Sequence, residues 1–248
     1  MLEDIVYIQQ KDGNWLNINC YEAFDGFTKS YYTVNPYTWE EVSSGKWLPP
    51  SKYNICVGAI GSIKEILRRH GVTPPTIMDY PPELSPWLYR DLSKSTLGEI
   101  FSKLQKEEFK EPLFVKPYED HKLFNGSLLT AFRDFIPLAG IDTKTPVWVS
   151  TKLNFLTEWR VFILRKQILD ARSYKGDPFI TPSKTIVEMM IGAYKYAPVG
   201  YGLDVGVLPT GETVLIEVND GFSLGNYGMG SLKYSQMLAA RWEEMVVQ

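Results

Sequence analysis

The 248-residue chain has very few of the side chains that most often bind transition metals or act as nucleophiles. It contains two cysteines, Cys20 and Cys56, and two histidines, His70 and His121. The cysteines form no metal-ligand motif, and two of them do not make a disulfide framework. Cys56 follows an apolar residue in Asn-Ile-Cys-Val and is predicted to be a small buried hydrophobe. Catalysis is therefore expected to depend on carboxylates, lysines and arginines.

The chain also lacks a strong net charge and a long apolar segment. The formal net charge is −3 and the isoelectric point is about 5.6, which gives no electrostatic footprint for nucleic acid. No apolar run reaches membrane-spanning length, and the N-terminal stretch has no basic region followed by an apolar one. The sequence predicts a cytoplasmic protein with no nucleic-acid or membrane partner, and it carries no signal for an oligomeric state.

The first third of the chain reads as a small α/β lobe. Strands are predicted at 4–9 and 53–60, and a helix at 61–69 that Gly71 ends as a C-terminal cap. Many aromatic residues lie between these strands, and basic residues are sparse among them. We expect the rings to pack in a core, because a platform for bases would interleave them with cations. The proline-rich segment 73–86 is the predicted linker.

A lysine and a glycine turn follow in the middle of the chain. Lys116 is the only charged residue inside a short apolar strand that ends at a proline. The polar turn after it contains Lys122 and Gly126, and a helix is predicted over 127–135. Backbone amides at a glycine turn and a helix start, here Gly126 and Ser127, suit phosphate oxygens, and a lysine adds positive charge. The alternative is that Lys116 is an ordinary surface lysine.

A late hairpin carries three oxygen-bearing side chains. Strands are predicted over 203–208 and 213–218, with a turn between them. Glu217 and Asn219 share one face because residues two apart in a strand do so, and Asp204 on the neighbouring strand could lie across from them. Two carboxylates and an amide oxygen suit Mg²⁺. The alternative is a hairpin whose polar face is only hydrated.

An arginine lies on a strand between these two regions. Arg160 belongs to the apolar strand 158–164, which a hairpin turn joins to a returning strand. Its planar fork suits the charge on a transferring phosphoryl group. An ion pair with Glu158 on the same strand face is the competing interpretation. Arg172 and Lys175 on the returning strand are weaker candidates for binding an acidic substrate.

In this order the motifs resemble the ATP-grasp superfamily of ligases. Within it, the chain is similar to the clade named for a shared arginine and two lysines, which is predicted to join amino acids or peptides. The resemblance covers about residues 85–230 and implies an α+β fold of mixed helices and strands with two ATP-grasp lobes. We therefore expect an N-terminal α/β lobe at 1–85, a small ATP-grasp lobe at 86–150, and a large lobe with the metal site at 151–248.

The resemblance also implies roles for individual residues. The strand 147–150 corresponds to the hinge whose backbone holds adenine between two lobes, and Arg160 and Lys122 have catalytic roles. Asp204, Glu217 and Asn219 are expected to bind Mg²⁺. The residues expected to bind ATP are Lys116, Lys122, Gly126, Ser127, Trp148, Val149, Ser150, Arg160 and Arg172.

The implied activity is an ATP-dependent, ADP-forming ligation with ATP and Mg²⁺ as cofactors. A substrate carboxylate attacks the γ-phosphate to give an acyl phosphate, and an amine then displaces phosphate to form an amide. The partners are a carboxylate donor and an amine acceptor, each a small molecule or a peptide. Two other functions stay open: a small-molecule kinase on the same fold, and a nucleotide-binding interaction module without turnover.

Overall fold

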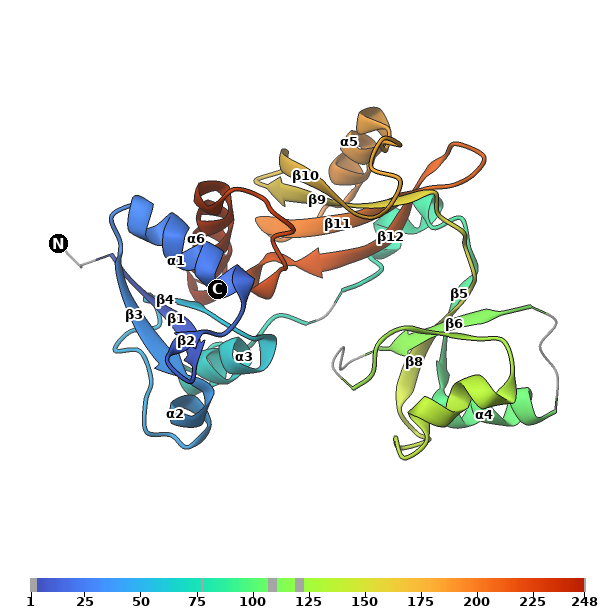
Figure 1. The fold of residues 1–248 in the computed structure, drawn as a ribbon, viewed down its shortest axis with the longest axis horizontal. Coiled ribbons are helices and arrows are strands. Elements are labelled where there is room, and N and C mark those ends of the chain that lie inside the picture. The colour runs from blue at the N-terminus through green and yellow to red at the C-terminus, as the bar shows by residue number, and fades with distance from the viewer. Residues whose placement is uncertain (1–3, 77, 107–110, 119–122, 248) are drawn as a thin grey trace. The chain divides into compact units, whose positions relative to one another are not determined.

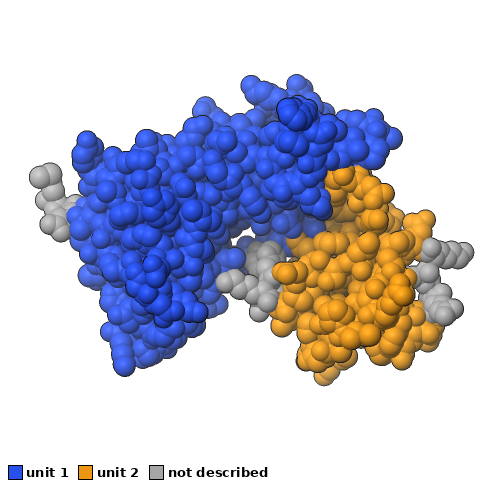
Figure 2. Space-filling model, viewed as in Figure 1, with its two compact units in different colours: residues 1–87, 156–248 blue, residues 88–155 orange. Residues whose placement is uncertain are grey.

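The computed structural model describes residues 4–76, 78–106, 111–118 and 123–247, which form two compact units (Figures 1 and 2). The first unit joins residues 1–87 to residues 156–248, and the second contains residues 88–155. The fold is α+β, as predicted. Among the described residues, no helix has the length and apolar character needed to cross a membrane. The finer division into three lobes stays a prediction.

The N-terminal part of the first unit is a small sheet with helices. Strand β1 pairs in parallel with β3 and β4 and antiparallel with β2. The predicted helix is confirmed, and Gly71 follows it with φ of +72°, the left-handed conformation of a C-terminal cap. The predicted strand at 53–60 is shorter than expected. The elements are β1 (Ile5–Lys11), β2 (Asn14–Trp15), α1 (Ile18–Lys29), β3 (Thr33–Thr38), α2 (Trp39–Ser43), β4 (Ile55–Val57) and α3 (Ile60–Arg69).

The C-terminal part of the first unit is an antiparallel sheet in the order β10-β9-β11-β12. Both predicted hairpins are present. Arg165 and Lys166 form the tight turn of the first, with φ of +50° and +62°. The strands are β9 (Thr157–Leu164), β10 (Gln167–Gly176), β11 (Gly200–Val207) and β12 (Thr213–Asp220). Helices α5 (Lys184–Ala193) and α6 (Ser231–Val247) and the 3₁₀ turns η1 (Pro82–Trp87) and η3 (Gly221–Ser223) complete the unit.

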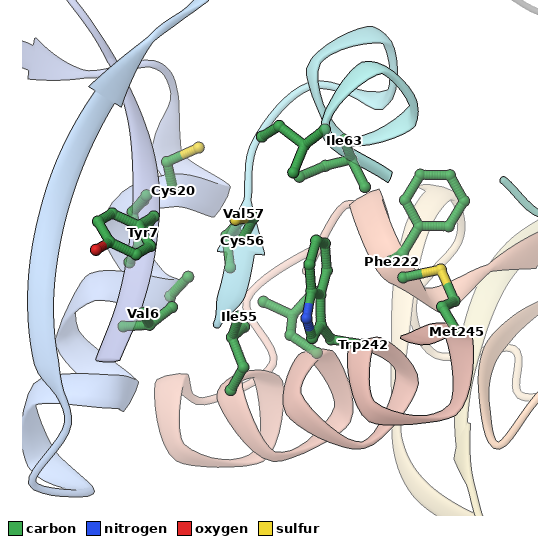
Figure 3. Packing of buried hydrophobic residues seen from close by; sticks show 14 of the residues in the cluster. Val6, Tyr7, Cys20, Ile55, Cys56, Val57, Ile63, Phe222, Trp242 and Met245 are labelled. Carbon is green, nitrogen blue, oxygen red and sulfur yellow. The ribbon is translucent and has the colours of Figure 1, made fainter. Parts of the chain in front are cut away.

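One hydrophobic core joins the two ends of the chain in this unit. The cluster includes Val6 of β1 and Ile63 of α3 together with Trp242 and Met245 of α6 (Figure 3). The indole Nε1 of Trp242 also donates to the carbonyl of Lys52 at 3.0 Å. Helix α6 thus completes the core of the N-terminal sheet, which explains why the first and last segments form one unit. Some of the aromatic rings pack in this core as predicted, for example Tyr37 stacked on Trp47 at 4.9 Å, whereas Tyr21, Tyr31 and Trp39 are exposed.

The second unit is an antiparallel sheet in the order β5-β8-β6-β7. Its elements are β5 (Leu92–Thr96), α4 (Leu97–Gln105), β6 (Leu113–Pro117), β7 (Ser127–Leu129), η2 (Phe132–Leu138) and β8 (Pro146–Thr151). The predicted helix over 127–135 is wrong. Ser127 begins a strand that pairs with β6, and only a 3₁₀ turn containing Pro137 follows. Pairing with β6 satisfies the backbone of this segment outside a helix.

Candidate functional site

Sheet register brings the predicted arginine and metal ligands into one row. Arg160 of β9 is the cross-strand partner of Asp204 of β11, and Asp204 is the partner of Glu217 of β12. Directly paired residues project from the same face of a sheet, so the three side chains are neighbours. Asn219 lies two residues beyond Glu217 on the same strand and therefore on the same face.

The side chains of this row are in direct contact. Arg160 donates two parallel hydrogen bonds to Asp204, from Nε to Oδ1 and from Nη2 to Oδ2, both 2.7 Å long. The amide Nδ2 of Asn219 lies 3.2 Å from Asp204 Oδ2 and 3.1 Å from Glu217 Oε1. Burial lowers the pKa of Arg160, but the hydrogen bond and charge of Asp204 outweigh it and the pKa is raised. The arginine therefore stays cationic in a buried position.

The oxygen chemistry of the row suits a hard divalent cation. Asp204 and Glu217 supply carboxylates, and a rotation of the Asn219 amide would present its oxygen in place of Nδ2. The described part of the chain contains no group of three or more His, Cys, Asp or Glu residues that could hold a metal. A metal bound here would therefore need the amide oxygen, together with water or substrate oxygens, to complete its coordination.

Arg160 and Glu158, both within the described part of the chain, do not form the ion pair that was the competing interpretation. Glu158 instead accepts a hydrogen bond from Lys175 Nζ at 2.5 Å. Arg172, the cross-strand partner of Arg160, pairs with Asp170 at 2.8 Å. Both weaker candidates for an acidic substrate thus already contact a carboxylate of this chain, and their role stays a prediction.

Two tyrosines beside the row were not identified from the sequence. The Tyr227 ring centroid lies 4.8 Å from Arg160 Cζ, and the ring stacks on Tyr174 at 5.1 Å. Burial is the main cause that raises the pKa of Tyr174. The negative charges of Asp204, Glu158 and Glu217 raise it further. Its hydroxyl therefore stays protonated. No sequence pattern indicates these contacts, because they join residues far apart in the chain.

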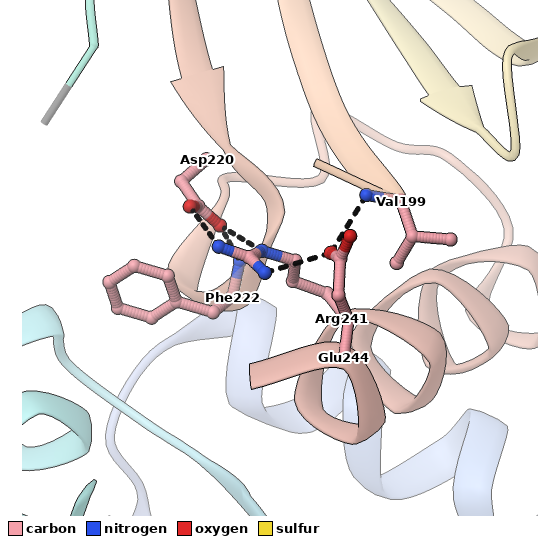
Figure 4. Close-up of polar contacts among 5 residues, drawn as sticks. All are labelled: Val199, Asp220, Phe222, Arg241 and Glu244. Atoms are coloured by element: carbon pink, nitrogen blue, oxygen red, sulfur yellow. Dashed lines mark hydrogen bonds and ion pairs between the residues drawn. The ribbon is translucent and has the colours of Figure 1, made fainter. Parts of the chain in front are cut away.

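The end of β12 is fastened to helix α6. Asp220, which follows Asn219, accepts two hydrogen bonds from Arg241, from Nε at 2.8 Å and from Nη2 at 2.7 Å (Figure 4). Arg241 Nη1 also donates to Glu244 at 2.8 Å, and Glu244 accepts from the backbone N–H of Val199 at 2.8 Å. This network ties the start of β11 and the end of β12 to one helix.

A second row of candidate residues lies on the sheet of the second unit. Trp148 of β8 is the cross-strand partner of Lys94 on one side and of Lys116 on the other. Lys116 is only 7% exposed, so it is not an ordinary surface lysine. Lys94 Nζ donates to the Tyr118 hydroxyl at 2.6 Å and lies 5.2 Å from the Trp148 ring. Lys94 was not identified from the sequence, although it also lies in a strand.

The backbone expected to hold adenine is already paired. Strand β8 lies between β5 and β6, so Trp148, Val149 and Ser150 have strand partners on both sides. This conflicts with a hinge whose backbone is available to a ligand at these residues. An interaction of their side chains with the nucleotide stays a prediction.

The predicted phosphate loop is only partly described. Lys122 lies outside the described residues. Gly126 has a packing reason for its identity, because a Cβ there would lie 2.4 Å from Phe114 Cζ. Ser127 Oγ donates to the carbonyl of Asn125 at 2.9 Å, within the turn. Ser127 begins a strand and not a helix, so the helix-start amides expected at this turn are absent from the described residues.

Several solved structures share the fold of this chain. The chain is similar to a D-alanine–D-alanine ligase from Bacillus anthracis complexed with ATP, with TM-score 0.61, 15% identity, and coverage of 98% of this chain and 97% of that one. It is also similar to D-cycloserine synthetase DcsG (TM-score 0.64, 11% identity, coverage 96% and 99%). A third is the macrocyclase MdnC from Microcystis aeruginosa, bound with precursor peptide MdnA (TM-score 0.53, 12% identity, coverage 98% and 100%). These likenesses show an ATP-grasp fold.

The family follows from the sequence itself. Residues 87–237, more than half of the chain, match the model of an ATP-grasp domain, family 2 of the clade named for an arginine and two lysines. The chain therefore belongs to this family, which confirms the resemblance and supports an ATP-dependent ligase. No curated protein matches the sequence.

Proposed function

We propose that this protein is an ADP-forming carboxylate–amine ligase that joins amino acids or peptides through an acyl phosphate. The observation that carries the proposal is the contact of Arg160, Asp204, Glu217 and Asn219 on one sheet face. It occurs in a chain of the ATP-grasp family, at the motif that the sequence predicted as the magnesium site.

Each unit, taken by itself, carries residues that would neutralise the charge of ATP phosphates. In the first unit, Asp204, Glu217 and Asn219 would hold Mg²⁺, which supplies charge neutralisation at the phosphates. Arg160 would stabilise the transferring phosphoryl group, since a guanidinium fork matches its oxygens. In the second unit, the buried Lys116 and its row neighbour Lys94 would supply cations to the nucleotide. Lys122, Gly126, Ser127 and Arg172 stay predicted ATP contacts.

The reaction needs little proton transfer by side chains. A carboxylate oxygen of the donor attacks the γ-phosphorus, the bond to the β–γ bridging oxygen breaks, and ADP leaves. An amine then attacks the acyl carbon, inorganic phosphate leaves with the bonding electron pair, and the amine loses a proton to solvent. Positioning and electrostatic stabilisation dominate phosphoryl transfer. The scarcity of histidine is compatible with this chemistry.

The nature of the substrates is supported by the structural neighbours. Their names include a D-alanine–D-alanine ligase and a macrocyclase bound with a precursor peptide. We accordingly propose an amino-acid or peptide carboxylate as donor and an amine of the same chemical class as acceptor. A cytoplasmic location is consistent with a demand for ATP.

The test is release of ADP and phosphate with Mg²⁺, ATP and a mixed pool of amino acids and short peptides. Glu217→Gln should reduce turnover at least tenfold, because removing one charged metal ligand leaves phosphate charge uncompensated. Glu212→Gln is the matched control, since Glu212 lies in the turn of the same hairpin, where its side chain accepts a hydrogen bond from Thr210.

The products separate the alternatives. AMP and pyrophosphate would refute the ADP-forming ligase. A stable phosphate ester, detected by product mass, would identify a kinase. Tight ATP binding without hydrolysis or transfer in any pool would identify an interaction module. Equal rates for Glu217→Gln and the wild type would remove the metal assignment.

A further inference from the structure

Tyr227 occupies a backbone conformation that tyrosine rarely adopts. Its φ is +43°, in the left-handed region that favours glycine. The neighbouring Asn226 is buried and anchors the loop on both sides. Its N–H donates to Asn19 Oδ1 at 3.0 Å, and its own Oδ1 accepts from the N–H of Gly228 at 3.1 Å. These two hydrogen bonds hold the backbone on either side of Tyr227 and help to fix its conformation.

This conformation places the Tyr227 ring over a buried cation. The ring centroid lies 4.8 Å from Arg160 Cζ, within the range of a cation–π interaction. The same loop supplies the carbonyl of Gly225, which accepts from Arg160 Nη1 at 3.4 Å. Tyr174 stacks on Tyr227 with an interplanar angle of 21° and supports the ring. Arg160 therefore has two contacts with this loop besides its fork on Asp204.

We propose that Tyr227 is a positioning residue that holds Arg160 in the site while Asp204 is shared with a divalent cation. In the structure both nitrogens of the Arg160 fork are bonded to Asp204. A cation at Asp204 would compete for the same oxygens and weaken that fork. The ring contact does not involve Asp204, so it persists and keeps the guanidinium from turning away.

This inference rests on the proposed function for its kinetic test. Tyr227→Leu should lower kcat roughly 3- to 30-fold, the range of a partly desolvated cation–π contact. The KM for ATP should change little, because Arg160 acts on the transferring group. Tyr227→Phe retains the ring and should keep the wild-type kcat. Tyr31→Leu is the matched control, since Tyr31 also has a positive φ of +64° and is 96% exposed.

A stability cycle tests the contact without any turnover. Tyr227→Leu is introduced into the wild type and into an Arg160→Met, Asp204→Asn background. That background removes both buried charges together and leaves neither unpaired. Tyr227→Leu should lower the thermal midpoint more in the wild type than in this background, because only the wild type offers a cation to the ring.

The outcomes distinguish this inference from the ligase proposal. Equal midpoint shifts in the two backgrounds, or a Tyr227→Phe kcat as low as that of Tyr227→Leu, would overturn the positioning role. Coupling in the stability cycle with no ADP release by the wild type would sustain the contact and reject the ligase.

Discussion

Arg241 offers the most direct test of how the site strands are held in place. The Arg241 side chain is 5% exposed and the Asp220 side chain 20% exposed. Burial lowers the pKa of Arg241, but hydrogen bonds and charges from Asp220 and Glu244 outweigh this effect and the pKa is raised. The guanidinium therefore keeps its charge. Arg241→Met would remove the two hydrogen bonds that Nε and Nη2 of Arg241 donate to Asp220. It would leave the hydrogen bond that Asp220 accepts from the N–H of Phe222 at 3.2 Å (Figure 4).

The expected loss of unfolding free energy follows from removing one partner of a buried ion pair. Such changes cost about 3–5 kcal/mol, since the remaining charge stays buried without its partner. Because Asp220 has some access to water, we expect the low end, about 3 kcal/mol of unfolding free energy. For a unit of this size that corresponds to a thermal midpoint roughly 6–12 °C lower. The double variant Arg241→Met, Asp220→Asn removes both charges and should recover at least half of the loss.

The assay combines calorimetry with hydrogen exchange. Calorimetry gives the midpoint, and exchange of the Val199 and Phe222 amides reports the two bonds made by Glu244 and Asp220. Arg68→Met is the control, because Arg68 is 59% exposed and its ion pair measures 3.8 Å. An Arg241→Met midpoint equal to that of the control, or a double variant less stable than the single one, would refute the reasoning.

Two further predictions concern nucleotide binding and buried thiols. Lys116→Ala should raise the ATP dissociation constant roughly tenfold or more, because a hydrogen bond to a charged group contributes about this much to affinity. Lys144→Ala is the control, since Lys144 is exposed. A Lys116→Ala dissociation constant equal to that of the control would give Lys116 a structural role only. Burial raises the pKa of Cys56 and raises that of Cys20 to about 11, from an ordinary value of 9.0. Unfolded thiols then ionise before native ones, so unfolding free energy should fall as pH rises from 9 towards 11. Replacing both cysteines by alanine should flatten this pH dependence, and an unaltered slope would contradict it.

Local signals were sufficient for the hairpin that carries the predicted metal ligands. Alternating apolar residues and a short turn fix which strand residues share a face and which lie opposite. The sequence indicated that Asp204 could lie across from Glu217 and Asn219, and the structure pairs it with Glu217, with a register shift between Asp204 and Val205. The helix ended by Gly71 was predictable for the same reason, because its cap is a local property.

Contacts between segments far apart in the chain could not be predicted from the sequence. The competing interpretation paired Arg160 with Glu158, two residues away, yet its partner Asp204 lies 44 residues further on. The segment at 127–135 has a pattern that favours a helix, but its first residues pair with β6 and form a strand. Intrinsic propensity is a weak preference that tertiary pairing overrides. The wrong helix prediction has this cause.

The position of the candidate site also depends on Gly202, which lies on the same sheet face as the row and is the cross-strand partner of Asn219. A Cβ at Gly202 would lie 3.0 Å from Leu224 Cδ2 and 3.4 Å from Arg160 Cδ, so glycine leaves room for both side chains. Leu224 is buried in the core shared by the N-terminal sheet and α6, and its carbonyl accepts from the Tyr234 hydroxyl at 2.7 Å. Since protein cores are close-packed, a shift of α6 or of the N-terminal sheet would move Leu224 and with it the adjacent Gly225, whose carbonyl accepts from Arg160 Nη1 at 3.4 Å. The geometry of Arg160 and Asp204 is therefore set by packing from both ends of the chain, and strands β9 to β12 alone would not preserve it.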